Sequence, residues 1–192
     1  MPIIGENKVI QSDSEIKAMI DAGMIEGAEL NQVRTGVISY GVTSYGYDMR
    51  TADEWQYFNH DSARVIDPKR GNLHELMTAT VAPHFKIPPN EFVLCRSLEY
   101  FRIPKDVLCV VVGKSTYARC GLIVNTTPLE PGWEGHVTIE LSNTAPLPIR
   151  VYANEGIAQV LFFRGRPAAK NYADKQGKYQ GQRGITLPKV ER

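Results

Sequence analysis

A segment with strict alternation carries a carboxylate that could serve as a general base. Residues 135–143 read G-H-V-T-I-E-L-S-N. Successive side chains of a strand point to opposite faces, so Glu140 and Thr138 should share the polar face while Ile139 faces the core. If the polar face meets solvent, Glu140 is an ordinary surface carboxylate. If it lines a cleft, desolvation raises the pKa of Glu140 and makes it a rigidly held base. The alternation leaves both interpretations open.

A second candidate site follows the apolar run at residues 107–112. Residues 113–119 read G-K-S-T-Y-A-R, which brings backbone N–H groups, hydroxyls and two cations into one turn. Such a turn could bind phosphate, and a helical turn would place Ser115 and Arg119 on one face. It is not a Walker loop, which needs G-x-x-x-x-G-K-[ST]. A short capped helix explains the same residues nearly as well.

Three further stretches place polar residues in expected strands or in the tail. Residues 44–50 (S-Y-G-Y-D-M-R) contain Asp48, residues 156–161 (G-I-A-Q-V-L) contain Gln159, and residues 177–184 read G-K-Y-Q-G-Q-R-G. A buried glutamine needs partners for its amide, which the backbone or a ligand can supply. Strand packing and a solvated tail are the alternative explanations.

These residues must be positioned by a mainly β architecture. The one clear helix signal lies over residues 12–22, where the capping box S-D-S-E precedes apolar residues at helical spacing and Gly23 follows. Strands are predicted near residues 38–50, 75–81, 91–101, 107–112, 121–125, 135–143, 147–152 and 156–164, separated by Pro, Gly and Asn. Because no long helices alternate with these runs, an antiparallel sandwich or jelly roll is expected rather than a doubly wound sheet.

The composition excludes several classes of protein. The chain has 192 residues, of which 43% are hydrophobic, and a net charge of +1. Its apolar runs are far shorter than the roughly 20 residues that span a bilayer, and residues 1–6 lack the blocks of a leader peptide. Three cysteines without a C-x-x-C pair, and histidines without ligand spacing, predict neither disulfides nor a structural metal. We expect a cytoplasmic protein with no membrane partner.

The last residues of the chain are strongly basic, although the net charge of the whole chain is only +1. Residues 164–192 hold eight basic and two acidic residues, a net charge of +6. Glycines, tyrosines and glutamines interrupt the basic residues, a pattern that favours a flexible lid over a small anion rather than binding of nucleic acid. A solvated tail explains the charge equally well.

The order of these motifs resembles the dCTP deaminase branch of the trimeric dUTPase-like superfamily. The motifs are Y-G-Y-D, G-K-S-T-Y-A-R, P-G-W-E-G followed by T-I-E, G-I-A-Q, and K-Y-Q-G-Q-R-G, and the resemblance covers residues 12–189. It implies a single domain over residues 1–192, with a distorted jelly-roll core at about 37–164 and a basic, glycine-rich lid at 165–192. It further implies a homotrimer with active sites shared between neighbouring subunits, and hydrolytic deamination of dCTP that is bound as its magnesium complex.

The resemblance also assigns residues to roles. Glu140 would be the general base that activates water, and Ser115 and Arg119 would lie beside the reacting cytosine. Lys114, which replaces an arginine of some relatives, would hold the triphosphate with Thr116 and the lid residues. Thr138, Ile139 and Gln159 would define the nucleoside pocket. The full implied set of substrate contacts is Lys114, Ser115, Thr116, Tyr117, Ala118, Arg119, Thr138, Ile139, Glu140, Gln159, Tyr172, Lys178 and Gln182.

Two chemical alternatives and one non-catalytic alternative stay open. Zinc deaminases use H-x-E with P-C-x-x-C, which this sequence lacks, so no zinc is expected and magnesium would serve the phosphates alone. In dUTP pyrophosphatases the segment that reads uracil resembles G-V-V-D-x-D-Y-R-G, with an Asp that positions the attacking water. The corresponding residues 127–135 of this chain read T-P-L-E-P-G-W-E-G and lack that Asp and the Tyr of the motif. We therefore expect dUTP as the main product, supplying thymidylate synthesis. A bifunctional enzyme that yields dUMP and a nucleotide-binding trimer without chemistry are the other hypotheses.

Overall fold

A capped helix begins the described part of the chain. The structure is a computed structural model that describes residues 9–59, 65–69 and 73–190, so the leader expectation at residues 1–6 and Arg192 lie outside the described residues. Helix α1 (Asp13–Asp21) begins after Ser12, whose backbone N–H donates to the Glu15 carboxylate at 2.8 Å, as the capping box predicted. Its apolar face buries Ile16 and Met19 against the sheet core.

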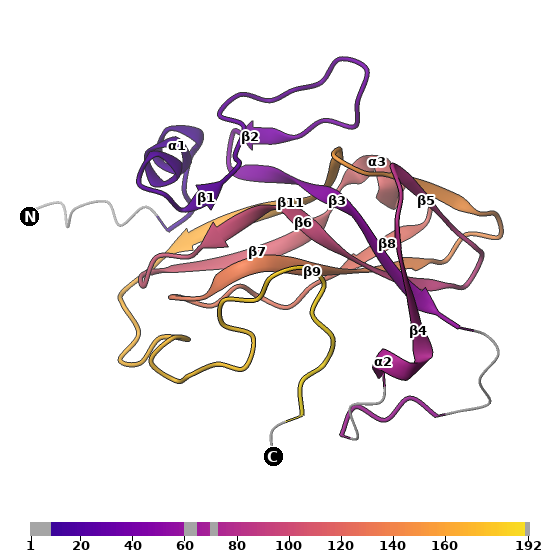
Figure 1. The fold of residues 1–192 in the computed structure, drawn as a ribbon. Helices are drawn as coiled ribbons and strands as arrows, with labels where there is room; N and C mark the ends of the chain where they lie inside the picture. Colours follow the sequence, from indigo (N-terminus) through magenta and orange to yellow (C-terminus); the bar gives the residue numbers. More distant parts are fainter. Residues whose placement is uncertain (1–8, 60–64, 70–72, 191–192) are drawn as a thin grey trace, which may run out of the picture.

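The sheet is antiparallel and nearly closed. Its main path runs β7-β11-β3-β6-β9-β8, with β1, β2 and β4 paired to its sides, and β7 packs near β8 at the two ends of the path (Figure 1). A separate ribbon joins β5 to β10. The bounds are β1 (Ile25–Glu26), β2 (Gly41–Thr43), β3 (Gly46–Phe58), β4 (Met77–Val81), β5 (His84–Ile87), β6 (Phe92–Arg102), β7 (Val107–Gly113), β8 (Leu122–Asn125), β9 (Glu134–Asn143), β10 (Ile149–Tyr152) and β11 (Gly156–Arg164), with short helices α2 (Leu73–Leu76) and α3 (Ser115–Ala118).

The core forms where the apolar faces of these strands meet. Val137, Ile139 and Leu141 of β9 are buried and the residues between them are half-buried, as the alternation predicted. Large side chains such as Trp55 and Phe162 are fully buried in the same core. Removal of this apolar surface from water is the main favourable term in folding. The mainly β prediction is confirmed.

The strand predicted at residues 38–50 is wrong in its bounds. The structure has a hairpin of β2 and β3 that turns between Thr43 and Gly46, and β3 continues to Phe58. A side chain at Gly46 would meet the Val160 carbonyl oxygen at 2.8 Å, so the chain needs glycine where the hairpin passes β11. The short strands β1 and β5 were not predicted, because each spans four residues or fewer and leaves too few positions to show alternation.

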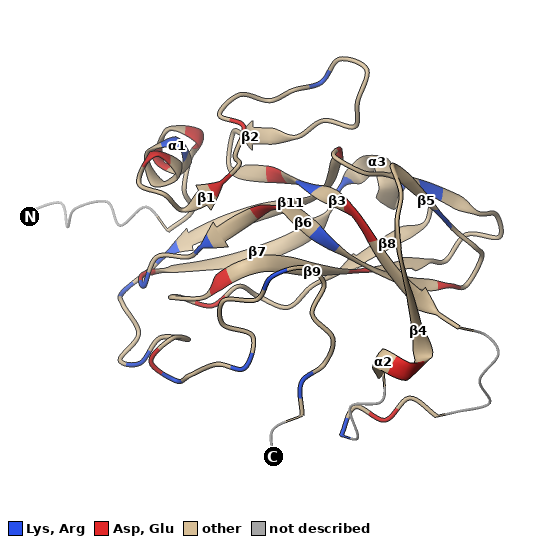
Figure 2. Ribbon diagram, in the orientation of Figure 1, with Lys and Arg blue, Asp and Glu red and all other residues tan. Residues whose placement is uncertain are grey.

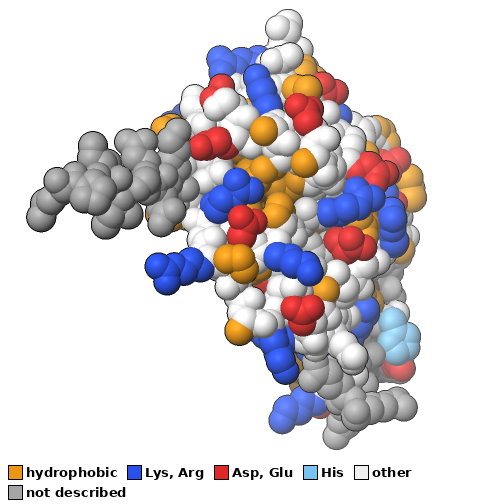
Figure 3. All heavy atoms as spheres, turned by 90° about the vertical axis from the view of Figure 1, so that its left-hand side faces the viewer, with side chains coloured by type: hydrophobic (Ala, Val, Ile, Leu, Met, Phe, Trp, Pro, Cys, Tyr) orange, Lys and Arg blue, Asp and Glu red, His pale blue; other side chains and the backbone are white. Residues whose placement is uncertain are grey.

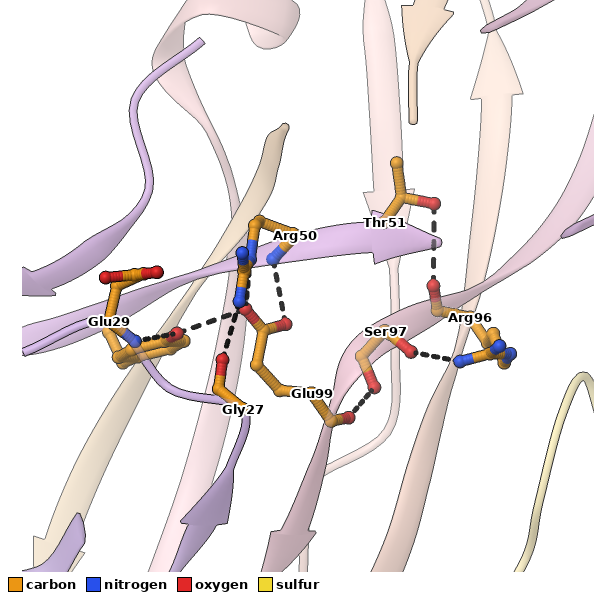
Figure 4. A network of polar contacts seen from close by, with 8 residues as sticks. Gly27, Glu29, Arg50, Thr51, Arg96, Ser97 and Glu99 are labelled. Carbon is orange, nitrogen blue, oxygen red and sulfur yellow. Dashed lines mark hydrogen bonds and ion pairs between the residues drawn. The ribbon is translucent and has the colours of Figure 1, made fainter. Parts of the chain in front are cut away.

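A buried carboxylate links β3 to β6. Glu99 is fully buried and accepts hydrogen bonds from the Arg50 Nε at 2.8 Å, the Arg50 backbone N–H at 3.0 Å and the Tyr47 hydroxyl at 3.0 Å. Figure 4 shows this network continuing through Ser97 and Arg96. Burial raises the pKa of Glu99, while Arg50 opposes that shift. The pair therefore serves the packing of two central strands.

The charged residues are distributed unevenly over the molecule. Several Lys and Arg residues are spread along the segment after β11, which lies below β9 in Figure 2. The face seen in Figure 3 instead mixes both signs around a small apolar area. None of the helices formed by the described residues is long and apolar enough to cross a bilayer.

Candidate active site

A polar cavity of about 570 Å³ opens beside the β2–β3 hairpin. Its walls come from α1, from the loop between β1 and β2, from β11 and from the start of α3. Three predicted substrate contacts lie in this wall, namely Lys114, Ser115 and Gln159. The full lining is Asp13, Lys17, Leu30, Asn31, Gln32, Arg34, Val42, Thr43, Ser44, Asp48, Gly113, Lys114, Ser115 and Gln159. Hydroxyls, amides and cations in such a wall suit a polar anionic ligand.

One turn of helix presents the G-K-S-T-Y-A-R residues. Lys114 is the N-cap of α3, and the Arg119 backbone N–H donates to the Ser115 carbonyl at 3.1 Å, so this segment forms the predicted helical turn. Tyr117 points inward, with 3% of its surface exposed, and its hydroxyl accepts from the Tyr152 backbone N–H at 3.1 Å. Tyr117 therefore anchors the turn. The exposed residues on the other side of the turn are Ser115, Thr116, Ala118 and Arg119.

Glu140 has the environment that a general base requires. It lies on the central part of β9, opposite Leu94 of β6 and Asn125 of β8, where both neighbours hold its backbone. Its Oε2 is buried and has no hydrogen-bond partner within the described structure. Burial raises the pKa of Glu140 to about 7, which a backbone hydrogen bond only partly offsets. A carboxylate with this pKa can both accept and return a proton near neutral pH.

The neighbours of Glu140 on β9 differ in what they can offer a ligand. Thr138 shares its polar face, and the Thr138 hydroxyl already accepts from the Thr186 backbone N–H at 3.1 Å. Ile139 is fully buried in the core, so only its backbone can reach a nucleoside.

The C-terminal segment lies against the polar face of β9. Gln182 Nε2 donates to the His136 carbonyl at 2.6 Å and lies 3.4 Å from the Thr138 hydroxyl, which brings two predicted substrate contacts together. Tyr172 and Lys178 stabilise the segment itself. The Tyr172 hydroxyl accepts from the Tyr179 backbone N–H at 3.1 Å, and the Lys178 Nζ lies 5.4 Å from the centre of the Tyr179 ring.

A single chain therefore divides the predicted residues between two places. Lys114, Ser115 and Gln159 line the cavity, whereas Thr138, Glu140 and Gln182 gather at β9. Neither Glu140 nor Arg119 is among the residues that line the cavity within the described structure. Figure 1 shows α3 at the upper right of the sheet and the C-terminal segment below β9.

Sequence reasoning missed part of the cavity wall. Gln32, Arg34, Thr43 and Lys17 belong to no motif, so no local signal pointed to them. Asp48 did carry a signal, because it stands between Tyr47 and Met49 in an expected strand, and a carboxylate that is buried there needs a partner. In the described parts of the chain, no three His, Cys, Asp or Glu side chains lie together as metal ligands.

Comparisons with known proteins agree on one family. Residues 10–165 match the family model described as dCTP deaminase-like. The chain is 58% identical over 183 residues to a dCTP deaminase of Herpetosiphon aurantiacus, which covers 94% of this chain and 99% of the relative. A dCTP deaminase of Acidobacterium capsulatum is 57% identical over 183 residues, with the same coverage of 94% and 99%.

One solved structure supports the fold at much lower identity. The 2'-deoxycytidine 5'-triphosphate deaminase from Agrobacterium tumefaciens superposes with a TM-score of 0.64 at 15% identity and covers 82% of this chain. The match covers 47% of that protein, so this chain spans about half the length of that structure. At this identity the likeness concerns the fold alone.

Proposed function

Because this chain belongs to the dCTP deaminase family, we propose that it hydrolyses dCTP to dUTP and ammonia with Glu140 as the general base. The observation that carries the proposal is the environment of Glu140, a carboxylate on a rigid strand with a buried, unpartnered oxygen and a pKa raised to about 7. A binding module has no need for a desolvated carboxylate of this kind.

The chemistry follows from two proton transfers through one carboxylate. Ionised Glu140 takes a proton from water, the oxygen bonds to C4 of cytosine, and the proton passes to the ring nitrogen N3. Glu140 then moves the second water proton to the amino group, the C4–N bond breaks, and ammonia leaves. Ser115 and Arg119 donate hydrogen bonds to the water and the base as charge develops.

The remaining residues bind the nucleotide. Thr138, the Ile139 backbone and Gln159 define the nucleoside pocket, and the α3 turn contributes the backbone of Tyr117 and Ala118. The triphosphate is held by the side chains of Lys114, Thr116, Tyr172, Lys178 and Gln182. Magnesium arrives with the phosphates as part of the substrate and keeps several of its own waters. The supporting observation is that Lys114 and Ser115 line a polar cavity that also holds the cations Lys17 and Arg34.

We propose a homotrimer whose sites are shared between neighbouring copies. The division of the predicted residues between the cavity and β9 supports this arrangement, since a second copy can bring α3 toward Glu140. Cyclic symmetry then builds identical sites from one interface. The three cysteines are unpaired, which suits the reducing cytoplasm as the place of action.

A single-turnover time course with magnesium-dCTP tests the reaction. Separation of dUTP, dUMP and pyrophosphate should show that dUTP accumulates while pyrophosphate stays near background. Release of pyrophosphate needs a second base, and the hypothesis of a bifunctional enzyme leaves that role to Glu130 in the loop before β9 or to Glu134 at the start of β9, approaching a phosphate from a neighbouring copy. Glu134 accepts from the Tyr100 hydroxyl at 3.3 Å, and Glu130 lies 3.9 Å from the Lys175 Nζ. Stoichiometric dUMP with pyrophosphate would show a bifunctional enzyme instead.

Replacement of the base tests the mechanism. Glu140→Gln keeps the shape of the side chain and loses only proton acceptance, so turnover should nearly vanish while magnesium-dCTP binding stays within about tenfold. The matched control is Glu130→Gln, an exposed carboxylate of the preceding loop, which should leave turnover unchanged. Comparable deamination by Glu140→Gln and the wild type would refute the assignment.

A further inference from the structure

We propose that Asp48 is a positioning residue that holds Lys114 and Gln159 in their binding geometry at the base of the cavity. The inference rests on the proposed function, because it concerns how the same cavity binds dCTP. Asp48 lies on β3 directly opposite Gly41 of β2 and Gln159 of β11. Only 3% of its surface is exposed, although it borders the cavity.

Both oxygens of Asp48 are used by residues of the cavity wall. Its Oδ2 forms an ion pair with the Lys114 Nζ and accepts from the Gln32 Nε2 at 3.1 Å. Its Oδ1 accepts from the Gln159 Nε2 at 3.3 Å. One carboxylate thus joins residues of three separate elements, namely the loop between β1 and β2, the N-cap of α3 and strand β11.

Asp48 determines where Lys114 points. A lysine has a flexible stem and loses much rotamer entropy when a ligand immobilises it. The pairing with Asp48 holds the ammonium at the cavity wall before any ligand arrives, with 10% of the Lys114 side chain exposed. One of the three ammonium donors faces Asp48, which leaves others for a phosphate oxygen.

Asp48 also determines the orientation of the Gln159 amide. An ionised carboxylate only accepts hydrogen bonds, so the amide NH₂ must face it. The same Nε2 lies 3.1 Å from the Thr43 hydroxyl, which further favours this orientation. The carbonyl oxygen of Gln159 is therefore presented as an acceptor for a hydroxyl or N–H donor of the nucleotide.

These contacts predict an effect on binding rather than on chemistry. Asp48 contacts residues that are proposed to hold the substrate, and in the described part of the chain its hydrogen-bond and ion-pair partners are Gln32, Lys114 and Gln159 rather than Glu140. Stability alone is a weak reason for a buried ion pair, since well-packed apolar residues often replace such pairs without loss. A positioning role explains why the pair lies at the wall of a cavity.

The test is Asp48→Asn, which keeps the size of the side chain and removes its charge. We expect KM and the directly measured Kd for magnesium-dCTP to rise roughly tenfold or more, with kcat within about threefold of the wild type. Asp48→Glu is the second variant if Asp48→Asn does not fold. It keeps the charge but displaces the carboxylate, so the same rise in KM is expected.

The matched control is Glu99→Gln, which breaks the buried ion pair between Glu99 of β6 and Arg50, the latter two residues along β3 from Asp48 (Figure 4). This variant should lower the melting temperature without changing KM. An Asp48 variant that folds and binds dCTP like the wild type would overturn the inference, as would an equal rise in KM for Glu99→Gln. Wild-type turnover in the same assay shows separately whether the proposed function holds.

Discussion

At the residue scale, two carboxylates of the sheet, Glu99 and Glu140, differ in whether their oxygens have hydrogen-bond partners. Glu99 is fully buried, and Arg50 and Tyr47 satisfy its oxygens. Glu140 is less buried, yet its Oε2 lacks a partner within the described structure. Buried polar atoms are almost always hydrogen-bonded in native proteins, and an unpartnered carboxylate oxygen with a raised pKa suits a group that receives a proton from a ligand. The contrast supports the proposal that Glu140 acts on the substrate whereas Glu99 supports the fold.

The raised pKa of Glu140 predicts a pH-dependent stability. The pKa is about 7 in the folded chain and near 4.5 when exposed, so the folded state binds more protons between these values. The contribution of Glu140 to stability is therefore lost as the pH rises from about 4.5 through 7. Glu140→Gln stays neutral throughout. Its melting temperature should exceed that of the substrate-free wild type at pH 8, and the difference should shrink at pH 5.

Calorimetry of both proteins at the two pH values checks this expectation. Glu130→Gln again serves as the control for a Glu-to-Gln replacement at an exposed position. A constant difference for Glu140→Gln would show that Glu140 is not desolvated.

At the scale of elements, the C-terminal segment is attached to β9 and to the residue before it by hydrogen bonds of both backbone and side-chain groups. The Gly181 N–H donates to the Glu134 carbonyl at 2.9 Å, the His136 N–H donates to the Gln182 carbonyl at 3.1 Å, and the Trp133 Nε1 donates to the Tyr179 carbonyl at 3.0 Å. Residues 165–190 form no helix or extended strand of their own. Such a segment can detach without disturbing the sheet.

Deletion of residues 170–192 should therefore damage function more than folding. We expect dCTP turnover to fall severely because Tyr172, Lys178 and Gln182 are lost, while the circular dichroism of the β core and the trimer mass persist. Trp133, with 6% of its surface exposed, should become solvated and its fluorescence should shift to the red. Unchanged kinetics together with the red shift of the fluorescence would show that the segment is a solvated tail without a role in turnover.

At the scale of the whole molecule, the divided site predicts functional complementation. Glu140→Gln and Arg119→Ala should each be inactive as homotrimers. When the two are co-expressed, a shared site can combine an intact Glu140 of one copy with an intact Arg119 of the next. Random assembly makes about one quarter of such sites intact. Activity near that fraction of the wild type is expected.

Separate purification followed by simple mixing without subunit exchange is the control, and it should stay inactive. Co-expressed trimers without activity would show that each site belongs to a single chain.

The sequence by itself determined those features that depend on neighbouring residues. The capping box at Ser12 and the alternation through Glu140 each repeat with the period of a helix or strand, so local spacing was sufficient to predict them. The order of five motifs was sufficient to predict the family and the fold. Neither pattern measures burial, so the sequence left open whether Glu140 meets solvent or a cleft.

Only the tertiary structure decided which distant residues meet. Asp48 contacts Lys114 across 66 residues of sequence and Gln159 across 111, and these contacts depend on the register of β3 with β11. The desolvation of Glu140 likewise depends on the strands on both sides of β9. A shift of one residue in pairing would turn every side chain to the opposite face. Local patterns state which face a residue prefers, whereas strand pairing decides what lies opposite that face.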